Sequence, residues 1–105
     1  MKIELLYIDD CPSWETGLQY LKSALLQEGI VGDVDLVKVN DDVEATHFKF
    51  LGSPSFLVNG SDLWQETRET FALSCRVYAT PTGIKGFPTV SMLREKLHSL
   101  DEKDL

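Results

Sequence analysis

The stretch Ile3-Glu4-Leu5-Leu6-Tyr7-Ile8-Asp9-Asp10-Cys11-Pro12-Ser13-Trp14 decides the fold. Residues 2–8 are apolar on both alternating faces, which is typical of a strand buried in the centre of a sheet. A cysteine follows where the next helix is expected to begin, and there exposed backbone N–H groups and the helix dipole favour its thiolate. Thiol–disulfide exchange requires that thiolate. Cys11 is therefore the first candidate for a reactive residue.

A helix and a second strand are predicted directly after this stretch. Apolar residues recur at three- and four-residue spacing from Ser13 to about Gln27, which predicts an amphipathic helix. The β-branched run over residues 34–39 predicts the second strand. Because a strand, a helix and a strand in this order indicate a right-handed crossover, we expect the two strands to be parallel neighbours, directly or across one strand.

The next region predicts a second helix and a third strand. Asp41 or Asp42 can cap a short helix that ends near Phe50, and residues 55–58 predict a strand that ends at the turn Asn59-Gly60. Residues 61–72 are polar and poorly periodic, which indicates a long loop, interpreted as an insertion.

The last third of the chain predicts one more strand and one more helix. Phe71, Leu73, Cys75 and Val77 alternate in the pattern of a strand that turns these side chains to one face. Residues 81–86 indicate a second loop, and apolar spacing over residues 90–100 predicts the final helix. The predicted class is α/β, in the order β-α-β-α-β-β-α, with a single domain over residues 1–105.

The charge balance argues against several classes of partner. Among the 105 residues, 10 Lys and Arg face 17 Asp and Glu, which gives a net charge of −7. A nucleic-acid phosphate backbone is therefore not an expected partner. No apolar run is long enough to span a membrane, and the first residues lack the pattern of a signal peptide, so a cytoplasmic location is expected. The 2 cysteines are then expected to be free or catalytic thiols.

The chain resembles the thioredoxin/glutaredoxin superfamily in the order of its elements, in Cys11 at the first strand–helix junction, and in the segment Gly52-Ser53-Pro54-Ser55-Phe56-Leu57-Val58-Asn59-Gly60. Cys-Pro-x-Trp together with Leu-Ser-Cys-Arg-Val-Tyr is similar to a group of small thioredoxin-like bacterial proteins. The resemblance implies a central four-stranded mixed sheet with helices on both faces. It also implies a cis peptide bond between Ser53 and Pro54.

The resemblance further implies roles for individual residues. Cys11 would be the catalytic thiol, with Pro12, Trp14, Ser53, Pro54 and Arg76 as its substrate-binding neighbours. The backbone of the cis-proline bend would be free to pair with an extended peptide or with glutathione. Trp14 also fits the core stripe of the first helix, and it stands where a dithiol motif has its second cysteine.

Cys75 admits two interpretations. The strand pattern places it on an apolar face, where a free cysteine packs as a core residue. Alternatively, it is a second catalytic thiol that resolves a mixed disulfide on Cys11. Asp9 and Asp10 oppose the helix dipole at Cys11, so we do not expect a strongly acidic thiol there.

The leading hypothesis is thus a thioredoxin-like protein with a thiol–disulfide or glutathione-linked redox role through Cys11, of monothiol type. A disulfide-containing protein or a small thiol would be its partner, with glutathione as a co-substrate and no resident cofactor or metal. Two alternatives remain open. One is a non-catalytic binding module on the same fold, and the other is soft-metal or organomercury handling through Cys11 and Cys75.

Overall fold

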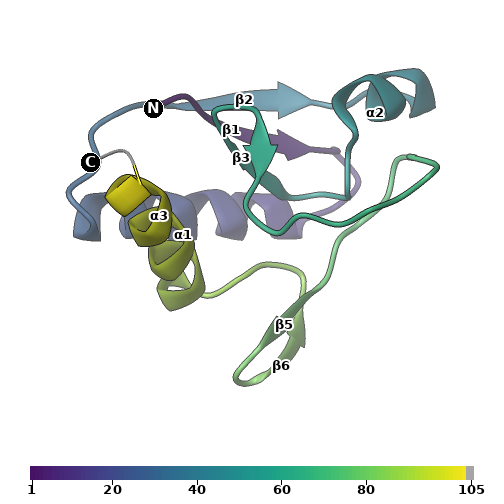
Figure 1. Ribbon diagram of the computed structural model, residues 1–105. Coiled ribbons are helices and arrows are strands. Elements are labelled where there is room, and N and C mark those ends of the chain that lie inside the picture. The colour runs from purple at the N-terminus through teal and green to yellow at the C-terminus, as the bar shows by residue number, and fades with distance from the viewer. Residues whose placement is uncertain (104–105) are drawn as a thin grey trace.

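The computed structural model describes the backbone of residues 1–103 and the side chains of residues 1–100. Figure 1 shows a small sheet that has two crossing helices packed beneath it and a short hairpin projecting from the body. The elements are, in order, β1 (Ile3–Tyr7), α1 (Ser13–Gln27), β2 (Val34–Lys38), α2 (Asp42–Phe48), β3 (Ser55–Val58), β4 (Ser61–Asp62), β5 (Tyr78–Thr80), β6 (Gly83–Lys85) and α3 (Val90–Lys103).

The main sheet has four strands in the order β2-β1-β3-β4. β1 pairs in parallel with β2 and antiparallel with β3, so that Leu5 lies between Leu36 and Phe56. β3 pairs antiparallel with β4. The mixed α/β class, the central position of the first strand and its parallel pairing with the second are therefore confirmed.

The two faces of β1 pack against different parts of the chain. Ile3 and Leu5 belong to the larger core cluster, together with residues of β3, α1 and α3. Leu6 and Ile8 point to the opposite face, where they form a second cluster that includes Cys11 and, from α2, Ala45. The helices α1 and α3 thus cover one face, while α2 and nearby loops cover part of the other.

The turn Asn59-Gly60 closes a hairpin between β3 and β4. Asn59 and Gly60 have positive φ angles of 52° and 85°, a conformation that Asn and Gly adopt at low cost. Val58 and Ser61 are paired across the turn. The fourth strand of the sheet therefore comes from residues 61–62, which the sequence had indicated to be the start of a loop.

The prediction of a fourth strand over residues 71–78 is wrong. Only Cys75 in this stretch makes a bridge, to Ser53, and the regular strand β5 begins at Tyr78. The inward and outward residues are also the reverse of the expectation, because Arg76 and Tyr78 are buried while Leu73, Cys75 and Val77 are exposed. Arg76 can point inward because polar groups of the cis-proline loop and of residues 62–66 surround its side chain.

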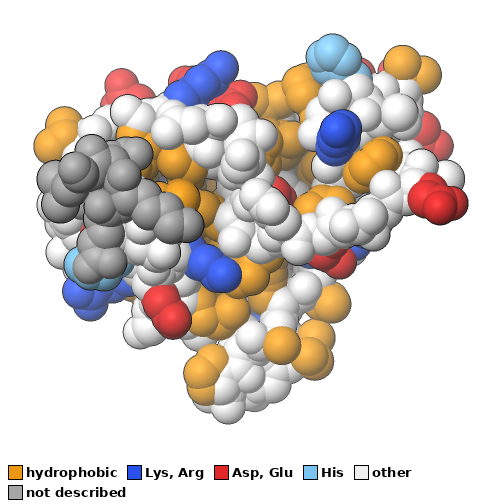
Figure 2. Space-filling model, in the orientation of Figure 1, with side chains coloured by type: hydrophobic (Ala, Val, Ile, Leu, Met, Phe, Trp, Pro, Cys, Tyr) orange, Lys and Arg blue, Asp and Glu red, His pale blue; other side chains and the backbone are white. Residues whose placement is uncertain are grey.

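The prediction of a loop over residues 81–86 is also wrong. Residues 83–85 form β6, which pairs with β5 as a two-stranded hairpin outside the main sheet. This hairpin is the projection at the bottom of Figures 1 and 2, and Ile84 on it is largely exposed. The final helix begins at the expected residue, and Asp41 caps α2 by accepting a hydrogen bond from the Glu44 N–H.

No helix within residues 1–103 is long and apolar enough to cross a membrane.

Close packing of α1 on the cis-proline loop makes Gly17 a test of the fold. A Cβ atom on Gly17 would lie 3.1 Å from Pro54 Cγ and 3.2 Å from Phe56 Cζ. We expect Gly17→Leu to lower the free energy of unfolding by about 1–3 kcal/mol because the larger side chain overpacks this contact. Ser23→Leu on the exposed side of α1 is the control and should change stability little. Equal denaturation midpoints for the two variants would contradict this packing.

Candidate functional site

The loop before β3 contains the predicted cis peptide bond between Ser53 and Pro54, which is confirmed. Its first residue, Gly52, has a φ of 116°, and a Cβ atom there would lie 2.8 Å from the Cβ of Arg76. Only glycine permits both this backbone conformation and this close approach. The glycine therefore allows the segment that contains Arg76 to pack closely against this loop.

Cys11 lies in the turn between β1, which ends at Tyr7, and α1, one residue before the N-cap Pro12. Its thiol donates a hydrogen bond to the Ser53 carbonyl over 3.5 Å, and the residue is only 3% exposed. It packs among Leu6, Ile8 and Phe50. The predicted position of Cys11 at the strand–helix junction and beside the cis-proline loop is thus correct, but its sulfur is enclosed.

Cys75 is joined to the same loop by backbone hydrogen bonds. The Ser53 N–H donates to the Ser74 carbonyl over 2.8 Å, and the Arg76 N–H donates to the Ser53 carbonyl over 3.0 Å. These bonds form a parallel bridge between Ser53 and Cys75. Bridge partners project to the same side, so Cys75 is carried toward the cysteine that contacts Ser53. Cys75 is exposed and both cysteines are free thiols, so its prediction as a core thiol is wrong.

The pKa of the Cys11 thiol is raised to about 11, mainly by burial. Cys75 raises the pKa further, through a hydrogen bond and, once it is a thiolate, through its negative charge. The Ser13 N–H at the start of α1 and the Ser53 hydroxyl act in the other direction and lower the pKa. The helix N-terminus therefore stabilises the thiolate as expected, but desolvation outweighs it.

The main opposing effect differs from the one that the sequence indicated. Asp9 and Asp10 were expected to oppose the thiolate, and Asp9 instead forms an ion pair with Lys38 across 2.5 Å. Burial of the sulfur is the larger cause. Cys11 is buried and protonated, whereas Cys75 is exposed. A reagent from solvent therefore meets Cys75 first.

Arg76 is buried and pairs with several groups at once. Its guanidinium donates to Asp62 Oδ2 over 2.9 Å and to the Trp64 carbonyl over 2.6 Å. It also donates to the Ser55 hydroxyl over 3.3 Å and lies 4.9 Å from the centre of the Tyr78 ring. The side chain points away from the solvent that reaches Cys75. Arg76 therefore anchors the 73–77 segment to β3, β4 and the loop that follows β4.

Two neighbours of Arg76 have raised pKa values, and burial is the largest cause in both. The pKa of Asp62 is raised despite the hydrogen bond and the charge of Arg76, which act to lower it. The pKa of Tyr78 is raised as well, and its hydroxyl donates to the Pro54 carbonyl over 2.6 Å. Tyr78 thus ties β5 to the cis-proline residue. The sequence analysis missed both contacts, because Asp62 is 14 residues from Arg76 and Pro54 is 24 residues from Tyr78.

The other predicted binding residues are placed as follows. Pro12 is exposed at the start of α1, and Trp14 stacks on Tyr7 with ring centres 4.2 Å apart. Tyr7 and Trp14 pack against the larger cluster, on the other face of β1 from Cys11. Ser53 is fully buried, and its hydroxyl accepts a hydrogen bond from the Ile8 N–H. Of the predicted set, Ser53 is the residue that contacts both cysteines.

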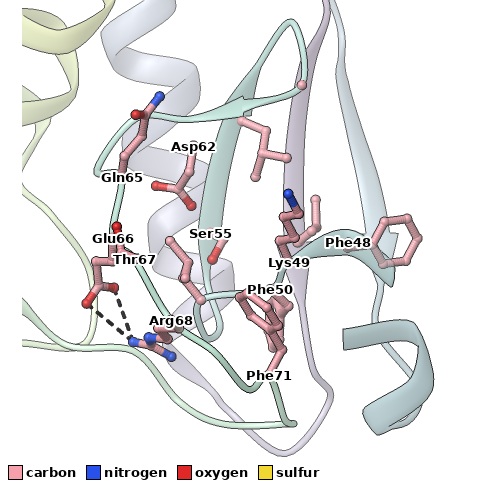
Figure 3. A pocket seen from close by; sticks show the side chains of 14 residues that line it. Phe48, Lys49, Phe50, Ser55, Asp62, Gln65, Glu66, Thr67, Arg68 and Phe71 are labelled. Atoms are coloured by element: carbon pink, nitrogen blue, oxygen red, sulfur yellow. Dashed lines mark hydrogen bonds and ion pairs between the residues drawn. The ribbon is translucent and has the colours of Figure 1, made fainter. Parts of the chain in front are cut away.

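A hollow of about 390 Å³ lies on the second face of the sheet, and the sequence did not predict it. Leu6, Leu57, Phe50 and Phe71 give it an apolar floor. Figure 3 shows charged and polar side chains of residues 62–68 along one side, with Glu66 paired to Arg68. Neither cysteine lines it, so it is separate from the cysteine pair.

Among the described residues, no group of three or more His, Cys, Asp and Glu side chains could hold a metal ion. A soft ion would find two sulfur ligands here and no third ligand of these types in the described part of the chain.

Comparison with protein-family models, with curated proteins and with solved structures finds no significant match to this chain.

The buried ion pair predicts a strong effect of removing Arg76. We expect Arg76→Met to lower the free energy of unfolding by about 3–5 kcal/mol at neutral pH, because it leaves the Asp62 carboxylate buried without a cation. Lys38→Met, which removes an exposed ion pair with Asp9, should cost at most about 1 kcal/mol. Chemical denaturation of both variants measures the difference.

The same variant has a defined pH dependence. Loss of Arg76 raises the Asp62 pKa further, so the folded state holds that proton more tightly than the unfolded state does. The stability linked to this proton is present at low pH and lost as the pH rises through the Asp62 pKa. The deficit of Arg76→Met relative to wild type should therefore narrow in acid. A deficit that is constant with pH would contradict the role of Asp62.

The raised Cys11 pKa predicts the order of alkylation. At neutral pH iodoacetamide should label Cys75 first, and the pH profile of the initial rate at Cys11 should have its midpoint near 11. In Cys75→Ser the midpoint for Cys11 should move down, because both contributions of Cys75 to the shift are removed. Peptide mapping by mass spectrometry gives both rates. Faster labelling of Cys11 than of Cys75 in the native wild type would refute this order.

Proposed function

We propose that this protein is a thiol–disulfide redox protein whose reactive unit is the pair Cys11 and Cys75. The observation that carries the proposal is that both cysteines meet at Ser53, one through its thiol and one through a backbone bridge. An exposed thiol beside a buried one is an arrangement in which the first reacts with a reagent and the second completes an internal disulfide.

The chemical steps follow from the two environments. The Cys75 thiolate attacks one sulfur of a disulfide, forms a mixed disulfide and releases one thiolate. Cys11 then loses its proton and attacks the Cys75 sulfur, which forms the Cys11–Cys75 disulfide and releases the second thiolate. In sum, two protein thiols are oxidised and one disulfide is reduced to two thiols; small thiols reverse the reaction.

The pKa of Cys11 supports this order of events. While Cys75 is a free thiol, it helps to hold the Cys11 pKa near 11. Once Cys75 is in a mixed disulfide, its charge and its hydrogen bond no longer oppose the Cys11 thiolate. The Ser13 N–H and the Ser53 hydroxyl still stabilise that thiolate. Cys11 thus becomes more reactive at the step that requires it.

The proposal modifies the monothiol mechanism. Trp14 removes the second cysteine of a Cys-x-x-Cys motif, and Cys75 supplies a second thiol from a distant part of the chain. A thioredoxin-like topology is part of the proposal, supported by the strand order β2-β1-β3-β4 and by a cis-proline directly before β3. A reversible thiol pair suits a reducing compartment, so we propose a cytoplasmic location.

Oxidation with hydroxyethyl disulfide tests the pair. Wild type should lose two hydrogens in intact mass and retain no adduct, while Cys11→Ser should hold a stable adduct on Cys75. Cys75→Ser should react slowly, because the remaining thiol is buried. The control Ser74→Cys/Cys75→Ser moves the exposed thiol by one residue, to the opposite side of the segment, and should keep its adduct. A stable adduct on wild type, with no internal disulfide, would contradict the proposed function.

A further inference from the structure

The backbone edge beside the two sulfurs is already occupied. One common way for an extended polypeptide to bind a protein is to add a strand to a free backbone edge. At the cis-proline loop that edge is Ser53, whose N–H is bonded to the Ser74 carbonyl and whose carbonyl accepts from the Arg76 N–H. The sequence led us to expect these groups to be free for a substrate. The chain's own segment 73–77 takes them instead.

This segment is held at several points. The Arg76 side chain is 6% exposed and pairs with Asp62, which is 12% exposed. The Tyr78 hydroxyl binds the Pro54 carbonyl, and the Leu73 N–H donates to the Asp42 carboxylate over 3.1 Å. A competing peptide would have to replace all of these contacts together. The edge is therefore closed in the folded protein.

Cys75 is nevertheless exposed to solvent. Its neighbours on the same side of the segment, Leu73 and Val77, are 40% and 67% exposed. A compact reagent can reach this sulfur from solvent without displacing the backbone. An exposed cysteine thus lies next to a closed backbone edge.

We infer that the disulfide that oxidises this pair is a low-molecular-weight compound and not a polypeptide, because the 73–77 segment occupies the edge on which a polypeptide would bind. The inference rests on the proposed function. The covalent steps are those given above, with a small disulfide RSSR as the oxidant and two RSH as the products.

Charge guides the choice of probe. The chain has a net charge of −7, Asp10 directly precedes Cys11, and Asp42 holds the segment two residues from Cys75. This acidic surrounding attracts a cationic disulfide and repels one that carries more carboxylates than amines. Cystamine is therefore the small probe. The polypeptide probe is an unstructured disulfide-linked hexapeptide dimer whose lysines match the charge of cystamine.

The experiment compares the rates at which the two probes form the internal disulfide. Each rate is divided by the rate of the same probe with N-acetylcysteine amide, which removes differences in intrinsic reactivity. We expect wild type to favour cystamine by at least about tenfold, the factor that two ordinary backbone hydrogen bonds correspond to. The variant Asp42→Ala/Tyr78→Phe removes two anchors of the segment, and in it the preference should shrink severalfold through a faster peptide reaction. Asp42→Ala alone replaces this variant if circular dichroism shows that the double variant is unfolded.

The outcomes separate the two proposals. Equal normalised rates for both probes on wild type would overturn the inference and leave the proposed function standing. A preference for cystamine that is unchanged in the loosened variant would also overturn it, since the segment would not be its cause. No internal disulfide with either probe would overturn the proposed function together with the inference.

Discussion

The two backbone hydrogen bonds between Ser53 and the 73–77 segment hold the site together. They connect the cis-proline loop before β3 to a segment that belongs to no strand of the main sheet. These bonds place the exposed Cys75 near the buried Cys11, and they place the Arg76 side chain in the protein interior. Because Gly52 has no side chain, the backbone of Arg76 can lie close to it. The Tyr78 hydroxyl binds the Pro54 carbonyl and so holds the chain that follows the segment. A single isolated bridge thus determines which groups can react.

The buried charge of Arg76 determines how the 73–77 segment is placed against Ser53. A guanidinium that leaves water needs most of its donors paired, and Arg76 finds partners in a carboxylate, a hydroxyl and a carbonyl. Because these partners come from β3, β4 and the loop that follows, the segment has one position in which all are satisfied. In residues 71–77 Arg76 therefore points into the protein, and the alternating apolar side chains Leu73 and Val77 are exposed to solvent. Polar satisfaction outweighs the modest gain from burying Leu73 and Val77.

The local parts of this account could be predicted from sequence, and the parts that depend on distant partners could not. The bounds of α1 and β3 and the turn at Asn59-Gly60 follow from periodicity and residue types. The cis bond before Pro54 was predicted from the resemblance of residues 52–60 to a known family. The orientation of Cys75 depends on Arg76, and that of Arg76 depends on Asp62, 14 residues away. No pattern within the segment contains this information. The raised pKa of Cys11 was missed for the same reason, since desolvation is set by tertiary packing.

A redox titration of the two thiols tests the central claim most directly. The protein would be equilibrated with dithiothreitol buffers of stepped potential, trapped by alkylation, and the reduced fraction of Cys11 and of Cys75 measured separately by peptide mapping. We expect both thiols to disappear together at one potential with the slope of a two-electron couple, and no disulfide to form between separate chains. Different midpoints for the two cysteines, or oxidation that only links separate chains, would contradict it.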